Sequence, residues 1–286
     1  MPEVPLPADP RAQNRAWWDA MAHAHRVAKD GYYDPAPLIA GKSSFGVLED
    51  AALDAAFPYG VDGLDVLHLQ CHLGLDAITL ARKGAKVTGV DFSPAALDGA
   101  RELAARCGVD LELVEADALN LPRGLRGRFD LVWATIGVLT WHSDLRAWMA
   151  SAASALRPGG RLVNLELHPL YCMPASLSPL TCDFPYAFDR GHAYDEPASY
   201  AGAELRPSVT VSVSWPHSLG EIVTAAVGAG LHVERLDEHL ATDMDPRGTL
   251  LVKEADGLYR WRLPSPDGGP GLPVPVMYTL ILSKPS

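Results

Sequence analysis

Several polar side chains that could bind a ligand or transfer a proton follow runs of apolar residues in this sequence. Asp91 ends a β-branched run, and the turn 70–74 (QCHLG) follows an earlier one. A carboxylate in such a place can accept hydrogen bonds from both hydroxyls of a ribose. His142, His168 and Tyr171 come after two later runs. Each of these three could take a proton from a substrate and act as a general base.

The elements that must position these residues begin with residues 65–91. A short apolar run ends in a turn at Gly74, an Ala/Leu-rich helical segment follows to Gly84, and a second run ends at Asp91. Strand, turn, helix, strand and acid form one βαβ nucleotide-binding unit. Such a unit places its ligand outside the carboxyl ends of the strands.

The chain then continues to alternate strands with helices. Apolar or β-branched runs predict further strands at 111–114, 129–134, 161–167, 232–236 and 276–282. Capping residues and helical periodicity predict helices that begin at Asp9, near Leu48, at Ser93, at Ser143 and at Ser218. We expect the first helix to end near Gly31. The alternation predicts an α/β fold with a mostly parallel sheet and helices on both faces.

Two segments depart from this alternation. Residues 1–60 carry several aromatic side chains, which could form a helical lid over the ligand or simply pack the first helix. Residues 169–217 are rich in Pro, Tyr and Phe, and the alternation over 209–215 predicts an antiparallel strand. We therefore expect an N-terminal helical lid segment and a domain over 61–286. An antiparallel or loop cap is inserted in that domain at about 169–217.

The composition limits the class of protein. The 286 residues carry a formal net charge of −11, which argues against a nucleic-acid partner. No stretch approaches 18 uninterrupted apolar residues, so we expect no membrane span. The four cysteines are too few and scattered for a disulfide framework, and the N-terminus does not resemble a secretory signal. We expect a cytoplasmic enzyme, and a homodimer is compatible with these features.

The turn 70–74 bears on which nucleotide is bound. A dinucleotide-binding enzyme needs glycines here so that the backbone can touch a pyrophosphate. Only Gly74 is a glycine, and the bulky Gln70 and His72 would crowd a diphosphate. This disfavours NAD and FAD. S-adenosylmethionine carries no phosphate, so the same turn can tolerate side chains when that cofactor is bound.

The wider motif order is more specific. VLHLQCHLG, VTGVDFSP, EADALNLP, FDLVWATIGVLTW and LRPGGRLV follow one another in the order of the class I S-adenosylmethionine-dependent methyltransferases, which residues 62–168 resemble. The resemblance implies a Rossmann-like sheet of seven strands, the last inserted antiparallel between the fifth and sixth. It departs at the first motif, where His68 replaces an acid and Gln70 and His72 replace two glycines. This Gln-Cys-His version looks like a variant subgroup.

The resemblance also implies roles for individual residues. The methionine half of the cofactor would be lined by Gln70, Cys71, His72 and Gly74. Asp91 would hold the ribose hydroxyls, and Phe92 would stack on the adenine. Asp117 and Ala118 would meet the adenine edge, while the backbone of Thr135 and Ile136 would meet the methionine amino group. We also place Tyr32 and His68 among the cofactor contacts, although His68 and His72 could equally be core histidines.

The implied reaction is an in-line displacement in which the protein aligns nucleophile, methyl group and sulfur. A hydroxyl or amine acceptor is helped by a general base, for which His142, His168 and Tyr171 are the main candidates and Glu166 a weaker one. Each could instead have a structural role. We expect O- or N-methylation of a small molecule, for example in secondary metabolism, with S-adenosylhomocysteine as product and no metal. A protein that binds S-adenosylmethionine without transferring methyl, or a cyclase, remains the alternative.

Overall fold

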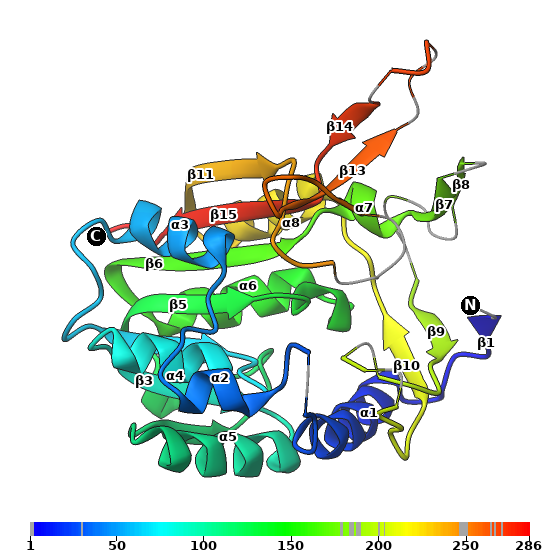
Figure 1. Cartoon of the computed structure of the whole chain (residues 1–286). Coiled ribbons are helices and arrows are strands. Elements are labelled where there is room, and N and C mark those ends of the chain that lie inside the picture. Colours follow the sequence, from blue (N-terminus) through cyan, green and yellow to red (C-terminus); the bar gives the residue numbers. More distant parts are fainter. Residues whose placement is uncertain are drawn as a thin grey trace.

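A seven-stranded sheet forms the centre of the molecule (Figure 1). Its strand order is β11-β15-β6-β5-β2-β3-β4, and β15 runs antiparallel to both of its neighbours, β6 and β11. The strands are β2 (Asp65–Leu69), β3 (Lys86–Asp91), β4 (Glu112–Glu115), β5 (Phe129–Thr135), β6 (Leu156–Leu167), β11 (His232–His239) and β15 (Met277–Ser283). The predicted α/β fold and the antiparallel insertion of the last strand are confirmed.

Both faces of the sheet are covered, because successive side chains of a strand point to opposite faces. On one face Leu67 and Val132 pack with Trp148 of α6. On the other face Val66 and Leu131 belong to a cluster with residues of α3 and α4.

The helices are α1 (Pro10–His25), α2 (Pro35–Ile39), α3 (Val47–Ala56), α4 (Leu75–Arg82), α5 (Pro94–Cys107), α6 (Leu145–Ala155), α7 (Pro169–Cys172) and α8 (Leu219–Gly228), with 3₁₀ turns η1 (Arg123–Leu125) and η2 (Leu139–Trp141).

The helix starts follow their caps, with one correction. Ser93 caps α5, and Ser218 with Glu221 forms the predicted capping box of α8. The prediction of Ser143 as the cap of α6 is wrong. The Asp144 carboxylate accepts the hydrogen bond from the N–H of Ala147 at 2.9 Å, because the helix begins one residue later. The first helix also ends at His25, well before Gly31.

The computed structural model describes residues 3–29, 31–177, 180–182, 186, 190–199, 201–202, 204–245, 251–263, 265, 267–269 and 271–286. The predicted cap at 169–217 thus lies partly outside the described residues. Its described part holds α7, β7 (Pro174–Leu177), β8 (Leu180–Cys182), β9 (His192–Asp195) and β10 (Val211–Ser214). With β1 (Glu3–Val4), β9 and β10 form an antiparallel sheet of order β1-β9-β10. The antiparallel strand expected at 209–215 is therefore present as β10.

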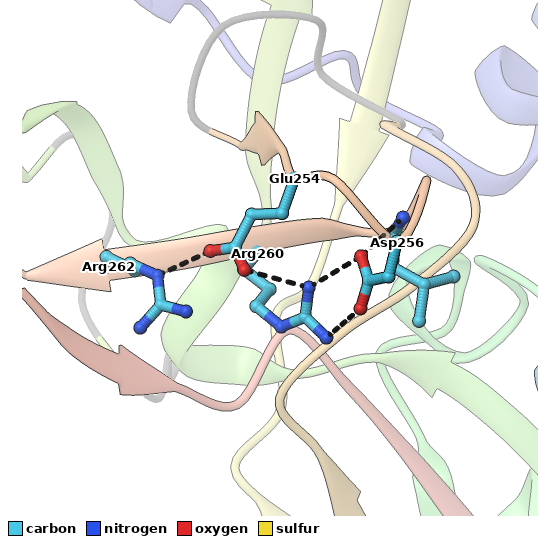
Figure 2. Close-up of polar contacts among 5 residues, drawn as sticks. Glu254, Asp256, Arg260 and Arg262 are labelled. Atoms are coloured by element: carbon cyan, nitrogen blue, oxygen red, sulfur yellow. Dashed lines mark hydrogen bonds and ion pairs between the residues drawn. The ribbon is translucent and has the colours of Figure 1, made fainter. Parts of the chain in front are cut away.

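The second irregular segment contains a small sheet that the sequence did not predict. It consists of β12 (Val252–Lys253), β13 (Tyr259–Leu263) and β14 (Leu272–Val274). Trp261 is buried, whereas Arg260 and Arg262 bind the carboxylate of Glu254 at 3.0 and 2.6 Å. Arg260 also pairs with Asp256 at 2.7 Å, so these two arginines and two acids form a connected set of ion pairs on the β12–β13 hairpin (Figure 2). No helix in the described ranges is long and apolar enough to cross a membrane.

Candidate functional site

A cavity of about 620 Å³ lies at the carboxyl ends of β2, β3 and β5. Its volume is in the range of pockets that enclose small molecules. The lining includes nine of the twelve residues predicted to bind the cofactor: Tyr32, His68, Gln70, Cys71, His72, Asp91, Phe92, Thr135 and Ile136. The three predicted residues outside the lining are Gly74, Asp117 and Ala118.

The turn that follows β2 has a left-handed backbone at alternate positions. The φ angles of Gln70, His72 and Gly74 are 61°, 48° and 73°. Among the described residues, Gln70 and His72 are the non-glycine residues with positive φ. This conformation costs an L-residue about 1–2 kcal/mol. The backbone thus keeps the geometry of a glycine-rich turn while carrying two large side chains that face the cavity.

Asp91 is buried at the end of β3, and both of its oxygens accept backbone hydrogen bonds. Oδ2 accepts from the N–H of His72 and Oδ1 from that of Ser93, each at 2.9 Å. Burial raises the pKa of Asp91 to about 6, although these backbone hydrogen bonds act in the opposite direction. Each carboxylate oxygen has a second lone pair, so the group can still accept from a ligand.

Residues 66–160 match the family model for a methyltransferase domain. This segment is a methyltransferase domain. The match confirms the resemblance to the class I S-adenosylmethionine-dependent methyltransferases. It includes β2, the turn 70–74, Asp91 and β5, which are the parts that form the base of the cavity.

Two curated relatives are similar over this methyltransferase domain. The demethylmenaquinone methyltransferase of Thermus thermophilus is 41% identical over 86 residues, 30% of this chain and 38% of its own. The ubiquinone biosynthesis O-methyltransferase of Methylocella silvestris is 33% identical over 123 residues, 42% of this chain and 46% of its own. The chain therefore spans less than half the length of these two relatives.

A solved structure shows the same fold over nearly the whole chain. It is the 1,6-didemethyltoxoflavin-N1-methyltransferase of Burkholderia thailandensis with bound 1,6-didemethyltoxoflavin and S-adenosylhomocysteine. The TM-score is 0.54 at 17% identity, and the superposition covers 99% of this chain and 94% of that chain. At this identity the likeness concerns the fold alone.

His142, predicted as a base, lies behind Gln70 of the methyltransferase domain rather than in the cavity lining. The amide oxygen of Gln70 accepts from the indole N–H of Trp148 at 2.7 Å and is 3.1 Å from Nε2 of His142. Burial, together with Arg11 and His217, lowers the pKa of His142 to about 3. His142 is therefore neutral and its Nε2 proton is directed at Gln70, so the structure favours a positioning role.

His168 and Tyr171 also lie outside the cavity lining. Nδ1 of His168 accepts from the N–H of Leu170 at 3.1 Å and caps α7, while Nε2 is 2.8 Å from a carboxylate oxygen of Glu238. Both ring nitrogens are thus engaged. Tyr171 is fully buried, and its hydroxyl donates to Asp245 at 3.4 Å. The structure favours a structural role for both residues.

Asp117 and Ala118 do not line the cavity, and their contact with the adenine stays a prediction. The carboxylate of Asp117 pairs with Arg11 of α1 and also accepts from the N–H of Leu119 at 2.9 Å. Ala118 is buried in the core. The ion pair joins Asp117 to a guanidinium that stands 106 positions away in the sequence, a contact that local sequence patterns do not predict.

Sequence reasoning missed Asp76 as a cavity residue. It lies in the first turn of α4, where an acid is ordinarily explained by the helix dipole. Its carboxylate accepts from the hydroxyls of Ser44 at 2.8 Å and Thr135 at 2.6 Å. His68 lies nearby, and its Nδ1 is buried without a hydrogen-bond partner among the described residues. Asp76 is thus a second buried carboxylate in the lining.

Glu166 shapes the end of β5. Its carboxylate accepts from the backbone N–H groups of Gly137 at 2.7 Å, Val138 at 2.6 Å and Leu139 at 3.2 Å. Burial raises the pKa of this carboxyl despite those hydrogen bonds. Within the described residues, no three His, Cys, Asp or Glu side chains are grouped so that they could hold a metal ion.

Proposed function

We propose that this chain is an S-adenosylmethionine-dependent methyltransferase that methylates oxygen or nitrogen of a small-molecule acceptor. The observation that carries the proposal is the cavity at the carboxyl ends of β2, β3 and β5. The base of this cavity belongs to the segment 66–160 that matches the methyltransferase family, and nine predicted cofactor residues line the cavity. Open α/β sheets bind their ligands at this edge.

The residues of the cavity fit this cofactor. The buried carboxylate of Asp91 suits the ribose hydroxyls, and the ring of Phe92 suits the adenine. Gln70, Cys71 and His72 would hold the methionine half. The side chains at positions 70 and 72 take the room that a pyrophosphate needs, so the turn favours a cofactor without phosphate.

An acceptor of small size is supported by the walls of the cavity and by the relatives. Aromatic rings of Trp18, Tyr33 and Trp141 line the side away from the sheet. The named relatives act on demethylmenaquinone, in ubiquinone biosynthesis and on 1,6-didemethyltoxoflavin. We propose that the acceptor of this protein likewise presents a planar ring to the cavity.

The cover of the site is proposed to consist of the N-terminal segment and the inserted cap together. Asn14 of α1 exchanges two hydrogen bonds with the backbone of Val213 in β10, at 2.7 and 2.8 Å. A side-chain amide that pairs with a strand in this way fixes α1 to the insertion. The two segments would then move as one unit over the ligand and exclude water.

The bound cofactor supplies an activated methyl group. The protein supplies orientation, which for well-aligned reactants is worth up to about 7–11 kcal/mol of the barrier. Gln70 is held by Trp148 and His142, so it offers the cofactor a fixed surface. Transfer from a sulfonium leaves a neutral sulfur, and a dry cavity favours this loss of charge.

The test is titration calorimetry with S-adenosylhomocysteine, followed by transfer assays on planar hydroxyl and amine compounds. We expect binding in the micromolar range and a loss of at least tenfold in affinity for Asp91→Ala. Absence of binding at millimolar concentration would refute the proposal. S-adenosylhomocysteine that forms in step with product distinguishes transfer from simple binding or cyclisation. The cytoplasmic location, the homodimer and the absence of nucleic-acid partners stay predictions.

A further inference from the structure

Three polar side chains from distant parts of the chain form one hydrogen-bonded series at the cavity. Nε2 of His72 lies 2.8 Å from Nδ1 of His25, and Nε2 of His25 lies 2.7 Å from the hydroxyl of Ser199. His72 belongs to the turn after β2, His25 to the last turn of α1, and Ser199 to the inserted segment. The cofactor turn is thus connected to both parts of the proposed cover.

The middle of the series is held rigidly. His25 is fully buried and stacks on Tyr33, with ring centroids 4.0 Å apart and planes inclined by 14°. The rings of Trp18 and His72 pack edge-to-face, with their centroids 5.2 Å apart. The hydroxyl of Ser199 also accepts from the N–H of Ala201 at 3.0 Å. These contacts leave little freedom for either imidazole to rotate.

Two proton arrangements satisfy the series when both imidazoles are neutral. Either Ser199 donates to His25 and His25 to His72, or His72 donates to His25 and His25 to Ser199. In the second arrangement Nδ1 of His72 carries no proton and can accept one. Burial lowers the pKa of His25 to about 3, and burial together with His25 lowers that of His72 well below its usual range.

Nδ1 of His72 is the open end of the series. No described residue hydrogen-bonds this atom, and His72 is half-buried and lines the cavity. The groups that face His72 are His25 and Trp18 of α1, Tyr33, and the Asp91 carboxylate, which accepts its backbone N–H. The left-handed backbone at this position would suit glycine better. Backbone strain that persists beside a cavity is a recognised sign of function.

We propose that His72 is the general base of the transfer, and that His25 and Ser199 form a relay that carries the proton away. This inference rests on the proposed methyltransferase function. The acceptor's O–H or N–H bond breaks, its proton goes to Nδ1 of His72, and its electron pair forms the bond to the methyl carbon. The Nε2 proton of His72 shifts to Nδ1 of His25, the Nε2 proton of His25 shifts to Ser199, and the hydroxyl proton of Ser199 goes to water.

The relay explains how a histidine with a lowered pKa can act as the general base. Burial raises the free energy of the charged imidazolium, so a proton that stayed on His72 would be unfavourable. Transfer of the second proton of His72 along the series keeps the imidazole neutral. It also explains why the chain keeps histidine where its own backbone conformation favours glycine.

The decisive variant is His72→Gly, because glycine relieves the left-handed strain and leaves Asp91 its backbone N–H. Because His72 also lines the methionine half of the cavity, we expect the dissociation constant for S-adenosylhomocysteine, measured by calorimetry, to rise by no more than about tenfold. General base catalysis is worth about 10²–10⁴-fold, so kcat should fall by that larger factor even when the cofactor is saturating. Added imidazole should restore at least tenfold of the lost rate. Unchanged kcat, or equal losses in binding and kcat without rescue, would overturn the proposal.

The relay is tested separately at His25. His25→Phe keeps a ring that can stack on Tyr33 but removes both nitrogens, and we expect kcat about tenfold lower at unchanged KM. His23→Ala is the matched control, since His23 is exposed on the same helix. Nitrogen-15 NMR of the resting protein gives a readout independent of activity. The pKa of His72 should rise in His25→Phe and not in His23→Ala; an unchanged value contradicts the contact on which the relay depends.

These results separate the two proposals. If the wild-type protein does not bind S-adenosylhomocysteine, the proposed function itself fails. If it binds the compound and transfers methyl, but His72→Gly keeps the full rate, the function stands and the base assignment fails.

Discussion

Asp91 should couple cofactor binding to the release of a proton. Burial raises its pKa to about 6. Ribose hydroxyls donate hydrogen bonds, which a charged carboxylate accepts more strongly than a neutral carboxyl. The ionised form is therefore the one that binds. Affinity should rise with pH and become constant above the pKa of Asp91.

The magnitude follows from the ionised fraction. With a pKa of about 6, half of the Asp91 carboxyls are ionised at pH 6 and roughly one in eleven at pH 5. The dissociation constant should then be about twofold and about elevenfold above its plateau value at these two pH values. The pKa values of His25 and His142 are lowered to about 3, so these side chains do not titrate in this range.

The same shift has a consequence for stability without ligand. The folded-state pKa lies above that of the unfolded chain, so the stability contributed by Asp91 is fully present below about pH 4. It is lost as pH rises through 6. The shift from 3.8 to about 6 corresponds to about 3 kcal/mol of unfolding free energy.

The assay is calorimetry with S-adenosylhomocysteine from pH 5 to 8, in two buffers of different ionisation enthalpy so that released protons are counted. In Asp91→Asn the pH dependence should vanish. Glu196→Gln is the matched control, because burial also raises the pKa of Glu196 while that residue is not part of the cavity lining. An affinity that is constant in the wild type, or a pH dependence that survives in Asp91→Asn, would refute the reasoning.

Three further predictions concern single residues. Gln70→Gly and Gln70→Ala should both destabilise the protein in denaturant titrations, because the buried indole N–H of Trp148 loses its acceptor; the glycine variant should be more stable than the alanine variant by about 1 kcal/mol, since it removes the left-handed strain. Equal stabilities would contradict that strain. His168→Asn should keep kcat within about threefold in the transfer assay, since its ring nitrogens serve α7 and Glu238; a hundredfold loss would return it to the catalytic candidates. Asp144→Ala should cost about 1 kcal/mol of unfolding free energy and Ser143→Ala close to none, and the reverse order would show that the cap of α6 is misplaced.

The sheet could be predicted because its strands carry their own signal. The β-branched run before Asp91 and the buried run 129–134 require no knowledge of their neighbours, and the motif order supplied the topology through the family resemblance. The position of Asp91 followed from the end of its strand. Eight of the twelve cofactor candidates line the cavity for the same reason, since the ends of β2, β3 and β5 meet at one edge, whereas the ninth lining residue, Tyr32, comes from the N-terminal segment.

Contacts between distant segments could not be predicted. Arg11 reaches Asp117 across 106 positions and His25 reaches His72 across 47, and nothing local marks either pair. Ser143 and Asp144 are both good caps, so only the folded backbone distinguishes them. The sheet of β12, β13 and β14 was not predicted because the Pro and Gly residues around it indicate a loop. Arg260 and Arg262 nevertheless alternate with Trp261 as in a strand.

The carboxylate of Glu166 also bears on which charges the site can accommodate. It already occupies the N–H groups of Gly137, Val138 and Leu139, the backbone donors that follow β5. A carboxylate or phosphate that approached this edge would find those donors already occupied by the carboxyl group of Glu166. An ammonium or another hydrogen-bond donor would not compete for them. We therefore expect the end of β5 to accommodate donor groups more readily than anionic ones.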